Sequence, residues 1–304
     1  MTRVVISGAS GFLGSHLARR LAAAGYDVVA LVRANSNLRR LADLTGRIHI
    51  ACLDQETLNG LLRKLTPIAA VIHAAVNYGR ADTKLSELVE TNVLFGLRLA
   101  EAAQSVGATC FINVGSALPP KVSPYALSKH QLSAWLQRLD QAVGMRIADV
   151  ALENMYGEDE NENQFVPRVI LACLRNVERL PLTAGDQQRD FIYIEDVVEA
   201  FALLLRYCLQ AEARMNGYAR YPLGSGNAVR IRDVASMIQQ ITGASTQLDF
   251  GAVPYRPHEA MFSQADLSAW KRLGWLPRHT LESGLRRAVA WWQNHLQETK
   301  RCAG

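Results

Sequence analysis

Tyr125 and Lys129 place a phenol and an ammonium group in one short segment, Tyr125-Ala126-Leu127-Ser128-Lys129. In a helix, this spacing puts both groups on the same face, one turn apart. A phenol has an ordinary pKa of about 10, and a nearby cation is expected to lower the pKa of Tyr125 toward neutrality. Ser116 closes an apolar run and can donate a hydrogen bond to the same oxygen. The three side chains predict general acid and base chemistry.

A glycine-rich segment follows the first apolar run of the chain and opens an amphipathic stretch. Its glycines permit a tight turn, let the backbone approach a pyrophosphate, and allow close packing of the helix. The segment predicts a dinucleotide site formed by Gly8, Ser10, Gly11, Phe12, Leu13 and Gly14.

Arg33 follows the second apolar run, at the position that separates the two nicotinamide dinucleotides. An acidic residue there would bind the ribose 2′-hydroxyl of NAD and repel a 2′-phosphate. Arg33 and Ser36, with Asn35, Arg39 and Arg40 close by, instead offer charge and donors suited to a phosphate. The sequence therefore favours NADP(H), and a solvated basic loop is the alternative interpretation.

The elements that position these residues alternate between short apolar runs and amphipathic stretches. Six such runs lie between Arg3 and Ala151: VVIS, DVVALV, RIHIAC, AAVIHAA, TCFINVG and MRIADVA. This rhythm predicts an α/β fold, with a doubly wound parallel sheet and helices on both faces. After Asn154 the rhythm breaks, and a smaller mixed α/β lobe is expected, with strands around Tyr221 and Leu248.

The predicted domains are residues 1–153 for the dinucleotide and residues 154–304 mainly for the substrate, with some segments returning to the first domain. The 304 residues are 49% hydrophobic and 20% charged, which is typical of a globular chain. The net charge of +5 is spread along the chain, so nucleic acid is not implied. There is no apolar run of membrane-spanning length, and a cytoplasmic protein is expected. Five cysteines without a CxxC pair predict neither a disulfide framework nor a metal site.

Several further motifs make the chain resemble the extended short-chain dehydrogenase/reductase family of sugar-nucleotide epimerases, dehydratases and reductases, which has a Rossmann-type fold. The motifs are His73-Ala74-Ala75, Thr91-Asn92-Val93 with Gly96, Asn154-Met155-Tyr156-Gly157, the run from Arg189 to Val197, Tyr255-Arg256-Pro257 with Glu259, and Leu273-Gly274-Trp275. Within the family, the segments Leu182 to Tyr193 and Ser123 to Lys129 most resemble the nucleotide-sugar 4-ketoreductases of the CDP-abequose and CDP-paratose synthase type.

The resemblance implies a role for each matching residue. Ser116, Tyr125 and Lys129 would be catalytic, and Lys129 would also hold the nicotinamide ribose. The cofactor would contact Tyr125, Lys129, the glycine-rich segment and His73, Ala74 and Ala75. The nucleotide diphosphate sugar would contact Ser116, Asn154, Arg189 and Arg256. For Arg189, a structural ion pair with Asp190 or Glu195 is the alternative.

The chain also departs from the family pattern. Ala51 and Cys52 stand where the family has an acidic residue that contacts adenine, and Asp54 is a shifted candidate for that contact. Ala151 replaces an arginine, and Glu158 replaces a proline. These departures predict a variant substrate pocket.

The two residues that follow Ser116 and the type of residue at position 33 narrow the range of reactions. The 4,6-dehydratases of the family carry an Asp-Glu pair directly after the catalytic hydroxyl residue, whereas this chain has Ala117 and Leu118. An epimerase usually carries NAD against an acidic residue, which Arg33 replaces. We therefore expect an NADPH-dependent 4-ketoreductase of a nucleotide-linked deoxyhexose in surface-polysaccharide biosynthesis. A 4-epimerase and a non-catalytic NADP(H)-binding regulator remain the alternatives.

A homodimer is also expected, mainly from the resemblance. Its helices would be the one that carries Tyr125 and one from about Lys84 to Val106. Apolar residues spread around more of the second helix than one buried face needs: Leu85, Leu88, Leu94, Leu97 and Leu99.

Overall fold

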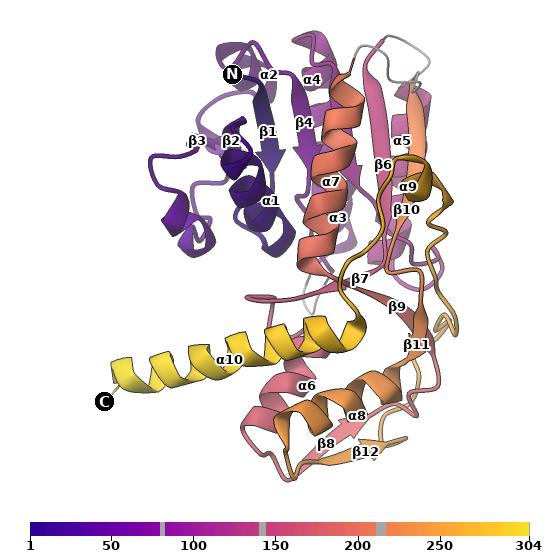
Figure 1. The fold of residues 1–304 in the computed structure, drawn as a ribbon. Coiled ribbons are helices and arrows are strands. Elements are labelled where there is room, and N and C mark those ends of the chain that lie inside the picture. The colour runs from indigo at the N-terminus through magenta and orange to yellow at the C-terminus, as the bar shows by residue number, and fades with distance from the viewer. Residues whose placement is uncertain (80–82, 140–143, 211–216, 304) are drawn as a thin grey trace. The chain divides into compact units, whose positions relative to one another are not determined.

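A computed structural model describes residues 1–79, 83–139, 144–210 and 217–303 (Figure 1). The chain divides into two compact units. The first consists of Met1–Leu152 and Val198–Pro222, and the second of Glu153–Val197 and Leu223–Gly304.

The first unit contains a seven-stranded sheet. Its strands, in spatial order, are β10 (Tyr218–Leu223), β6 (Arg146–Leu152), β5 (Cys110–Val114), β4 (Ala70–His73), β1 (Arg3–Ser7), β2 (Asp27–Val32) and β3 (His49–Cys52). The neighbours from β6 to β3 are all parallel. The predicted doubly wound parallel sheet is confirmed. The strand around Tyr221, which was expected in the smaller lobe, is instead the edge strand β10 of this sheet.

Helices cover both faces of the sheet. The helical elements of the first unit are α1 (Phe12–Ala23), η1 (Arg39–Leu44), η2 (Leu53–Gln55), α2 (Leu58–Lys64), α3 (Leu85–Val89), η3 (Glu90–Leu94), α4 (Phe95–Ser105), α5 (Pro124–Leu139) and most of α7 (Ile194–Leu209). Buried side chains of α2, α4 and α5, such as Leu62, Leu99 and Leu132, pack with strand residues such as Val71 and Phe111. Figure 1 shows α1 and α7 on the other face.

The expected helix from Lys84 to Val106 is interrupted. Its middle, Glu90–Leu94, is a π-helical stretch between α3 and α4. Such stretches add a residue to one turn and are frequent at functional sites. Here the stretch contains the Thr91-Asn92-Val93 motif, and the Asn92 side chain is completely buried. The predicted helix is therefore found from Leu85 to Ser105, with π-helical rather than α-helical turns at the motif.

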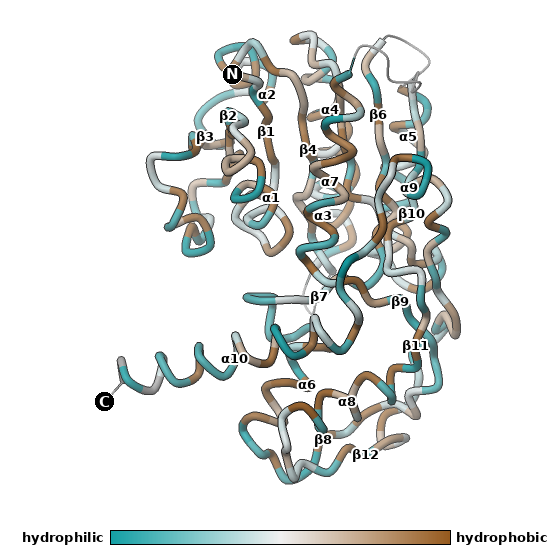
Figure 2. Tube along the Cα trace, in the orientation of Figure 1, coloured by the Kyte–Doolittle hydropathy of each residue, from teal (hydrophilic) through white to brown (hydrophobic). Residues whose placement is uncertain are grey.

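The second unit contains two small sheets, β11-β9-β7 and β12-β8. Their strands are β7 (Asn154–Tyr156), β8 (Arg179–Leu182), β9 (Gln188–Tyr193), β11 (Ala228–Arg230) and β12 (Gln247–Phe250), and the helices are α6 (Phe165–Leu174), α8 (Ile231–Thr242), α9 (Ser268–Arg272) and α10 (Leu281–Ala303). Figure 2 shows that α6 is hydrophobic along most of its length, whereas α10 alternates with hydrophilic residues. Over the described residues, none of the helices is both long and apolar enough to cross a membrane.

Candidate active site

Ser116 lies in the loop after β5, beside the end of β6. The Gly115 amide donates to the Val150 carbonyl at 2.8 Å, and the Ala117 amide donates to the Leu152 carbonyl at 3.1 Å. These two bonds hold the residues on either side of Ser116 along β6. The side chain of Ser116 is buried in consequence. Its position at the carboxyl end of a parallel strand is where such sheets present their ligands.

Tyr125 and Lys129 lie one turn apart near the start of α5, as predicted. Ser123 precedes the helix, and its Oγ accepts a hydrogen bond from the Ala126 amide at 3.1 Å. This contact satisfies one of the free amides at the helix start. Lys129 is 2% exposed, which is rare for a lysine and marks it as a residue with a specific role.

Ser116 and Tyr125 are joined by a side-chain hydrogen bond. The Leu118 amide donates to the Ser116 Oγ at 3.2 Å. Because this amide uses an acceptor site of the hydroxyl, the serine proton is available to the tyrosine oxygen. The structure thus brings the two predicted catalytic oxygens together.

The expected effect of Lys129 on Tyr125 is not found. Burial of the hydroxyl and the nearby Tyr78 raise the pKa of Tyr125 well above its ordinary value, while the bond from Ser116 lowers it. Burial also lowers the pKa of Lys129 to about 8, and Asp149 acts in the opposite direction. The prediction of a tyrosine pKa near neutrality is wrong for this structure, because burial outweighs the other effects. The phenol holds its proton at neutral pH.

Tyr78 is a residue of this site that the sequence did not reveal. Its ring lies against the ring of Tyr125, and 41% of the residue is exposed. Asn92 fixes the loop before it: its Nδ2 donates to the Asn77 carbonyl and its Oδ1 accepts from the Asn77 amide, each at 2.7 Å. The same Nδ2 lies 2.9 Å from the Oγ of Ser128 on α5. The π-helical asparagine therefore ties the Tyr78 loop to α5, the helix that carries Tyr125 and Lys129.

The glycine-rich segment has the geometry that a dinucleotide needs. Gly8 has a positive φ of 69°, and a Cβ there would lie 2.5 Å from the Ala75 nitrogen. A Cβ on Gly14 would collide with the carbonyl of Gly8. Gly11 caps α1 without a side-chain hydrogen bond. The first amides of this helix have no partner within the helix, which suits a pyrophosphate.

The side chains of the other residues in the segment differ in their exposure. Ser10 and Phe12 are partly exposed, while the Leu13 side chain is buried in the core. Leu13 can therefore contact a cofactor only through its backbone.

His73, Ala74 and Ala75, which the resemblance assigns to the cofactor, lie at the end of β4 next to Ser7 and Gly8. The Ser7 carbonyl accepts from the Ala74 amide at 3.1 Å, and the Ser7 Oγ lies 2.8 Å from the His73 Nδ1. Burial lowers the pKa of His73 to about 3, and Lys129 adds to this effect. The imidazole is consequently neutral at physiological pH.

Arg33 is exposed just beyond the end of β2. Its amide donates to the Oγ of Ser36 at 3.0 Å, which closes a turn. The carboxylate of Asp54 accepts from the next amide, that of Ala34, at 2.5 Å. Asp54 therefore brings a negative charge to the loop of Arg33, a contact that the sequence did not reveal.

Of the four predicted substrate residues, Asn154, Arg189 and Arg256 lie in the second unit, whereas Ser116 lies in the first. Arg189 is buried and pairs with the carboxylate of Glu259. The Glu259 amide donates to the Arg256 carbonyl at 3.1 Å, so Glu259 connects Arg189 to the turn of the exposed Arg256. The Asn154 Nδ2 makes a long contact of 3.4 Å with the Asp190 carbonyl.

The alternative ion pairs of Arg189 with Asp190 or Glu195 are not those of the structure. The buried Asp190 carboxylate accepts the amides of Ser225, Gly226 and Ala265 instead. Glu195 pairs with Arg287 at 2.5 Å. Asp190 is therefore a structural anchor of the second unit.

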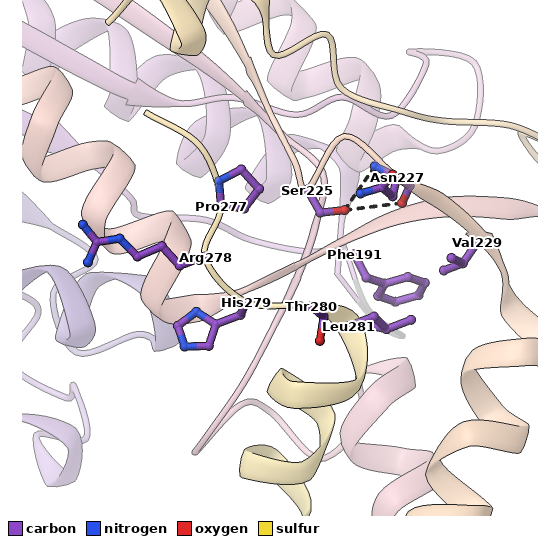
Figure 3. A pocket seen from close by; sticks show the side chains of 9 residues that line it. All are labelled: Phe191, Ser225, Asn227, Val229, Pro277, Arg278, His279, Thr280 and Leu281. Carbon is purple, nitrogen blue, oxygen red and sulfur yellow. Dashed lines mark hydrogen bonds between the residues drawn. The ribbon is translucent and has the colours of Figure 1, made fainter. Parts of the chain in front are cut away.

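A shallow pocket of about 280 Å³ also lies in the second unit (Figure 3). Phe191, Ser225, Asn227 and the segment 277–281 contribute to its lining, which excludes Asn154, Arg189 and Arg256. Figure 3 shows the ring of Phe191 pointing toward Val229 and Leu281. This pocket is distinct from the predicted substrate residues.

A Rossmann-type sheet with a glycine-rich loop and a Ser-Tyr-Lys set defines a nicotinamide-dependent class of enzyme. The model of the NAD dependent epimerase/dehydratase family matches residues 4–216, and the chain belongs to this family. Among curated proteins, the chain is similar to the CDP-abequose synthase of Salmonella typhimurium, at 28% identity over 93% of this chain and 95% of the relative. It is also similar to the dTDP-4-dehydro-6-deoxy-D-allose reductase of Streptomyces bikiniensis, at 25% identity over 96% of each chain. Among solved structures, MoeE5 in complex with UDP-glucuronic acid and NAD has a TM-score of 0.82 at 28% identity, covering 96% of this chain and 99% of that one.

Proposed function

We propose that this protein reduces the 4-keto group of a nucleotide-linked deoxyhexose, with NADPH as the reductant. The observation that carries the proposal is the hydrogen-bonded pair of Ser116 and a protonated Tyr125. Ala117 and Leu118 directly follow Ser116 in the sequence. Elimination of water needs a further acid and base, and these two apolar residues supply neither. Reduction needs one acid beside the carbonyl oxygen, which Tyr125 provides.

The residues of the first unit have separate roles in this reaction. Ser116 donates a hydrogen bond to the sugar carbonyl and polarises it. Tyr125 gives its proton to the alkoxide, which is a much stronger base than the phenolate that remains. Lys129 binds the nicotinamide ribose through its ammonium group. When bound, the reduced nicotinamide supplies the hydride.

The second unit supplies the residues for the nucleotide part of the substrate. Arg189 and Arg256 are suited to a diphosphate because guanidinium groups make paired contacts with its oxygens. In this proposal the diphosphate replaces Glu259 as the partner of Arg189, and Asn154 contacts the sugar. The similarity to CDP-abequose synthase supports a CDP-linked 4-keto-3,6-dideoxyglucose as the substrate and O-antigen synthesis as the setting.

The preference for NADPH rests on the exposed Arg33 and the turn that it forms with Ser36. Both can reach a 2′-phosphate next to β2. The carboxylate of Asp54, which accepts from the adjacent Ala34 amide, favours NAD because it would repel a 2′-phosphate. The contact of Asp54 is also the specific observation in favour of the second candidate, a 4-epimerase that retains NAD.

One assay separates the two candidates. The purified protein is incubated with NADPH and a panel of CDP-, UDP- and dTDP-linked 4-keto sugars, and the loss of absorbance of NADPH is followed. A ketoreductase consumes one NADPH for each sugar reduced, and NMR of the product gives its stereochemistry. An epimerase instead interconverts two sugars without net consumption and is purified with bound NAD(H).

We also propose that the protein is a homodimer in the cytoplasm. Leu85, Val89 and Leu94 on α3 and η3, with Leu127 and Trp135 on α5, are between 37% and 66% exposed. Apolar side chains that gather on neighbouring helices favour a protein partner. A second copy of the chain is the partner that the resemblance implies.

A further inference from the structure

A buried carboxylate, Asp149, lies behind the catalytic residues in the middle of β6. It is completely buried, although the strand around it is apolar. Its Oδ1 accepts from the Asn113 Nδ2 at 2.7 Å, and its Oδ2 accepts from the Tyr218 hydroxyl at 3.0 Å. A buried charge destabilises a protein unless it is paired and hydrogen-bonded. The burial of Asp149 therefore indicates a specific role for its carboxylate.

The side-chain amide of Asn113 is oriented toward the carboxylate at the expense of its own oxygen. Asn113 is the cross-strand neighbour of Asp149 on β5, and its Oδ1 is buried without a hydrogen-bond partner within the described residues. An unpaired buried acceptor destabilises the fold. Asn113 therefore donates to Asp149 even though this orientation leaves its own oxygen without a partner among the described residues.

One branch of the network reaches Ser116. The Nε of Arg220 on β10 lies 4.0 Å from the Asp149 Oδ2, and its Nη2 donates to the Ser116 carbonyl at 3.2 Å. Gly115 packs directly on the carboxylate, since a Cβ there would lie 2.7 Å from the Asp149 Oδ1. The loop of Ser116 therefore rests on Asp149.

A second branch reaches Lys129. The hydroxyl of Tyr218 donates to Asp149 and lies beside the side chain of Ser133 on α5. The Oγ of Ser133 in turn donates to the Lys129 carbonyl at 3.1 Å. The carboxylate also supports the charged form of Lys129, since it raises the pKa that burial lowers to about 8.

We propose that Asp149 is a positioning residue, which ties the loop of Ser116 and the helix of Lys129 to one buried carboxylate. Asp149 touches neither substrate nor cofactor in this role. The proposal rests on the proposed function of Ser116 and Lys129, and it adds a residue that the reaction scheme does not include.

The first test is Asp149→Asn, which keeps the size and an acceptor oxygen but removes the charge. We expect kcat for the best sugar of the panel to fall by about tenfold or more, with KM for that sugar within about threefold. The affinity for NADPH should decline at a lower pH than in the parent, because Lys129 loses its proton more easily. His73 on β4 also interacts with Lys129, and its pKa of about 3 keeps it neutral over this range.

The matched control is Asp27→Asn. Asp27 is another carboxylate of the same sheet, paired with Arg3 at 2.7 Å at the start of β2, and it has no place in the network. This variant should retain the parent kcat and the parent pH dependence. A purely structural role of Asp149 would lower the melting temperature and leave the pH dependence unchanged, and that result overturns the proposal.

Two milder variants keep the test decisive if Asp149→Asn does not fold. Arg220→Gln removes the branch to Ser116, and Tyr218→Phe removes the branch to Lys129. We expect each to lower kcat several-fold, and parent values of kcat in both would overturn the proposal.

Cofactor binding separates this proposal from the reaction itself. Titration of the parent and of Asp149→Asn with NADPH and with NADH, between pH 6 and 9.5, needs no sugar. If the parent reduces no sugar of the panel but the binding curves still shift, the reaction is wrong and the role of Asp149 stands. Identical pH dependence of the two proteins rejects Asp149 whatever the reaction is.

Discussion

The ring of Tyr78 lies on the ring of Tyr125, with centroids 5.2 Å apart and planes inclined by 33°. The phenol of Tyr125 therefore contacts both Ser116 and a second aromatic ring. The loop of Tyr78 is itself anchored by Asn92, whose side chain also contacts Ser128 on α5. The position of Tyr125 thus depends on residues from three separate segments.

Tyr78→Leu should lower turnover, whereas Tyr78→Phe should retain turnover within about threefold. An aromatic pair is worth about 0.5 to 1.5 kcal/mol beyond its buried area, which corresponds to at most roughly tenfold in the population of the correct Tyr125 orientation. Phenylalanine keeps this pair and removes only the hydroxyl. Steady-state kinetics of both variants test the prediction, and equal turnover of the leucine variant and the parent would contradict it.

Tyr125→Phe should reduce turnover by at least about 100-fold, because general acid catalysis is typically worth roughly 10² to 10⁴. Binding of NADPH should survive, since only the hydroxyl is lost. Lys129→Ala should impair both turnover and cofactor affinity, and the two substitutions should be far from additive. Kinetics and NADPH fluorescence titration measure these effects. Turnover of the phenylalanine variant within about threefold of the parent would remove Tyr125 as the acid.

Arg33→Asp should reverse the cofactor preference from NADPH to NADH. A charge-assisted contact with a 2′-phosphate is worth about 1.5 to 3 kcal/mol, and an aspartate would repel that group. Asp54→Asn is the complementary variant, and it should strengthen NADPH binding because it removes a negative charge beside Ala34. Equal affinity of the parent for both cofactors would refute the preference.

Glu153→Gln should stabilise the protein at pH 8 and have little effect at pH 4. Burial raises the pKa of Glu153 from 4.5 to about 7, although Ser263 donates to its two oxygens at 2.7 and 2.9 Å. Between these two pKa values the folded chain keeps a proton that the unfolded chain releases, so the free energy of unfolding falls as pH rises. Glutamine avoids this loss. Melting temperatures across this pH range test the prediction.

The control for Glu153 is Glu282→Gln, at an exposed pair with Arg286. It should leave the pH dependence of the melting temperature nearly unchanged, because exposed pairs contribute little. A parallel pH dependence in the parent and in Glu153→Gln would show that Glu153 ionises normally.

Trp135→Arg should convert a dimer into a monomer, as measured by light scattering at micromolar concentration. The tryptophan is 54% exposed, and a buried charge at a contact between two copies would oppose association. Leu276→Arg, at a residue of the second unit that is 53% exposed, is the matched control and should stay dimeric. A monomeric parent would reject the dimer outright.

The sequence predicted the features that depend on local pattern. The apolar runs became β1 to β6, and Tyr125 and Lys129 lie on one helix because their spacing matches its turn. The π-helical stretch could not be predicted, since it depends on the contacts of Asn92 with a distant loop. The raised pKa of Tyr125 likewise depends on burial and on Tyr78, which no spacing encodes.

The sequence does contain a signal for the buried network. Asp149 and Asn113 are polar residues within otherwise apolar runs, a pattern that indicates a buried polar contact. Their partners Tyr218 and Arg220 lie on β10, which comes after strands of the second unit in the chain. Only the topology of the sheet shows that the four residues meet.

The late return of β10 to the first sheet has a consequence for the order in which the protein is made. When the ribosome has released residues 1–153, β6 is an open edge, and Asp149 still lacks Tyr218 and Arg220. An unpaired edge strand invites pairing with other chains, and an unsatisfied carboxylate in it opposes folding. The nascent sheet is therefore incomplete until residue 222 has emerged. A gene truncated after the sixth strand should yield an aggregating polypeptide rather than an independent nucleotide-binding domain.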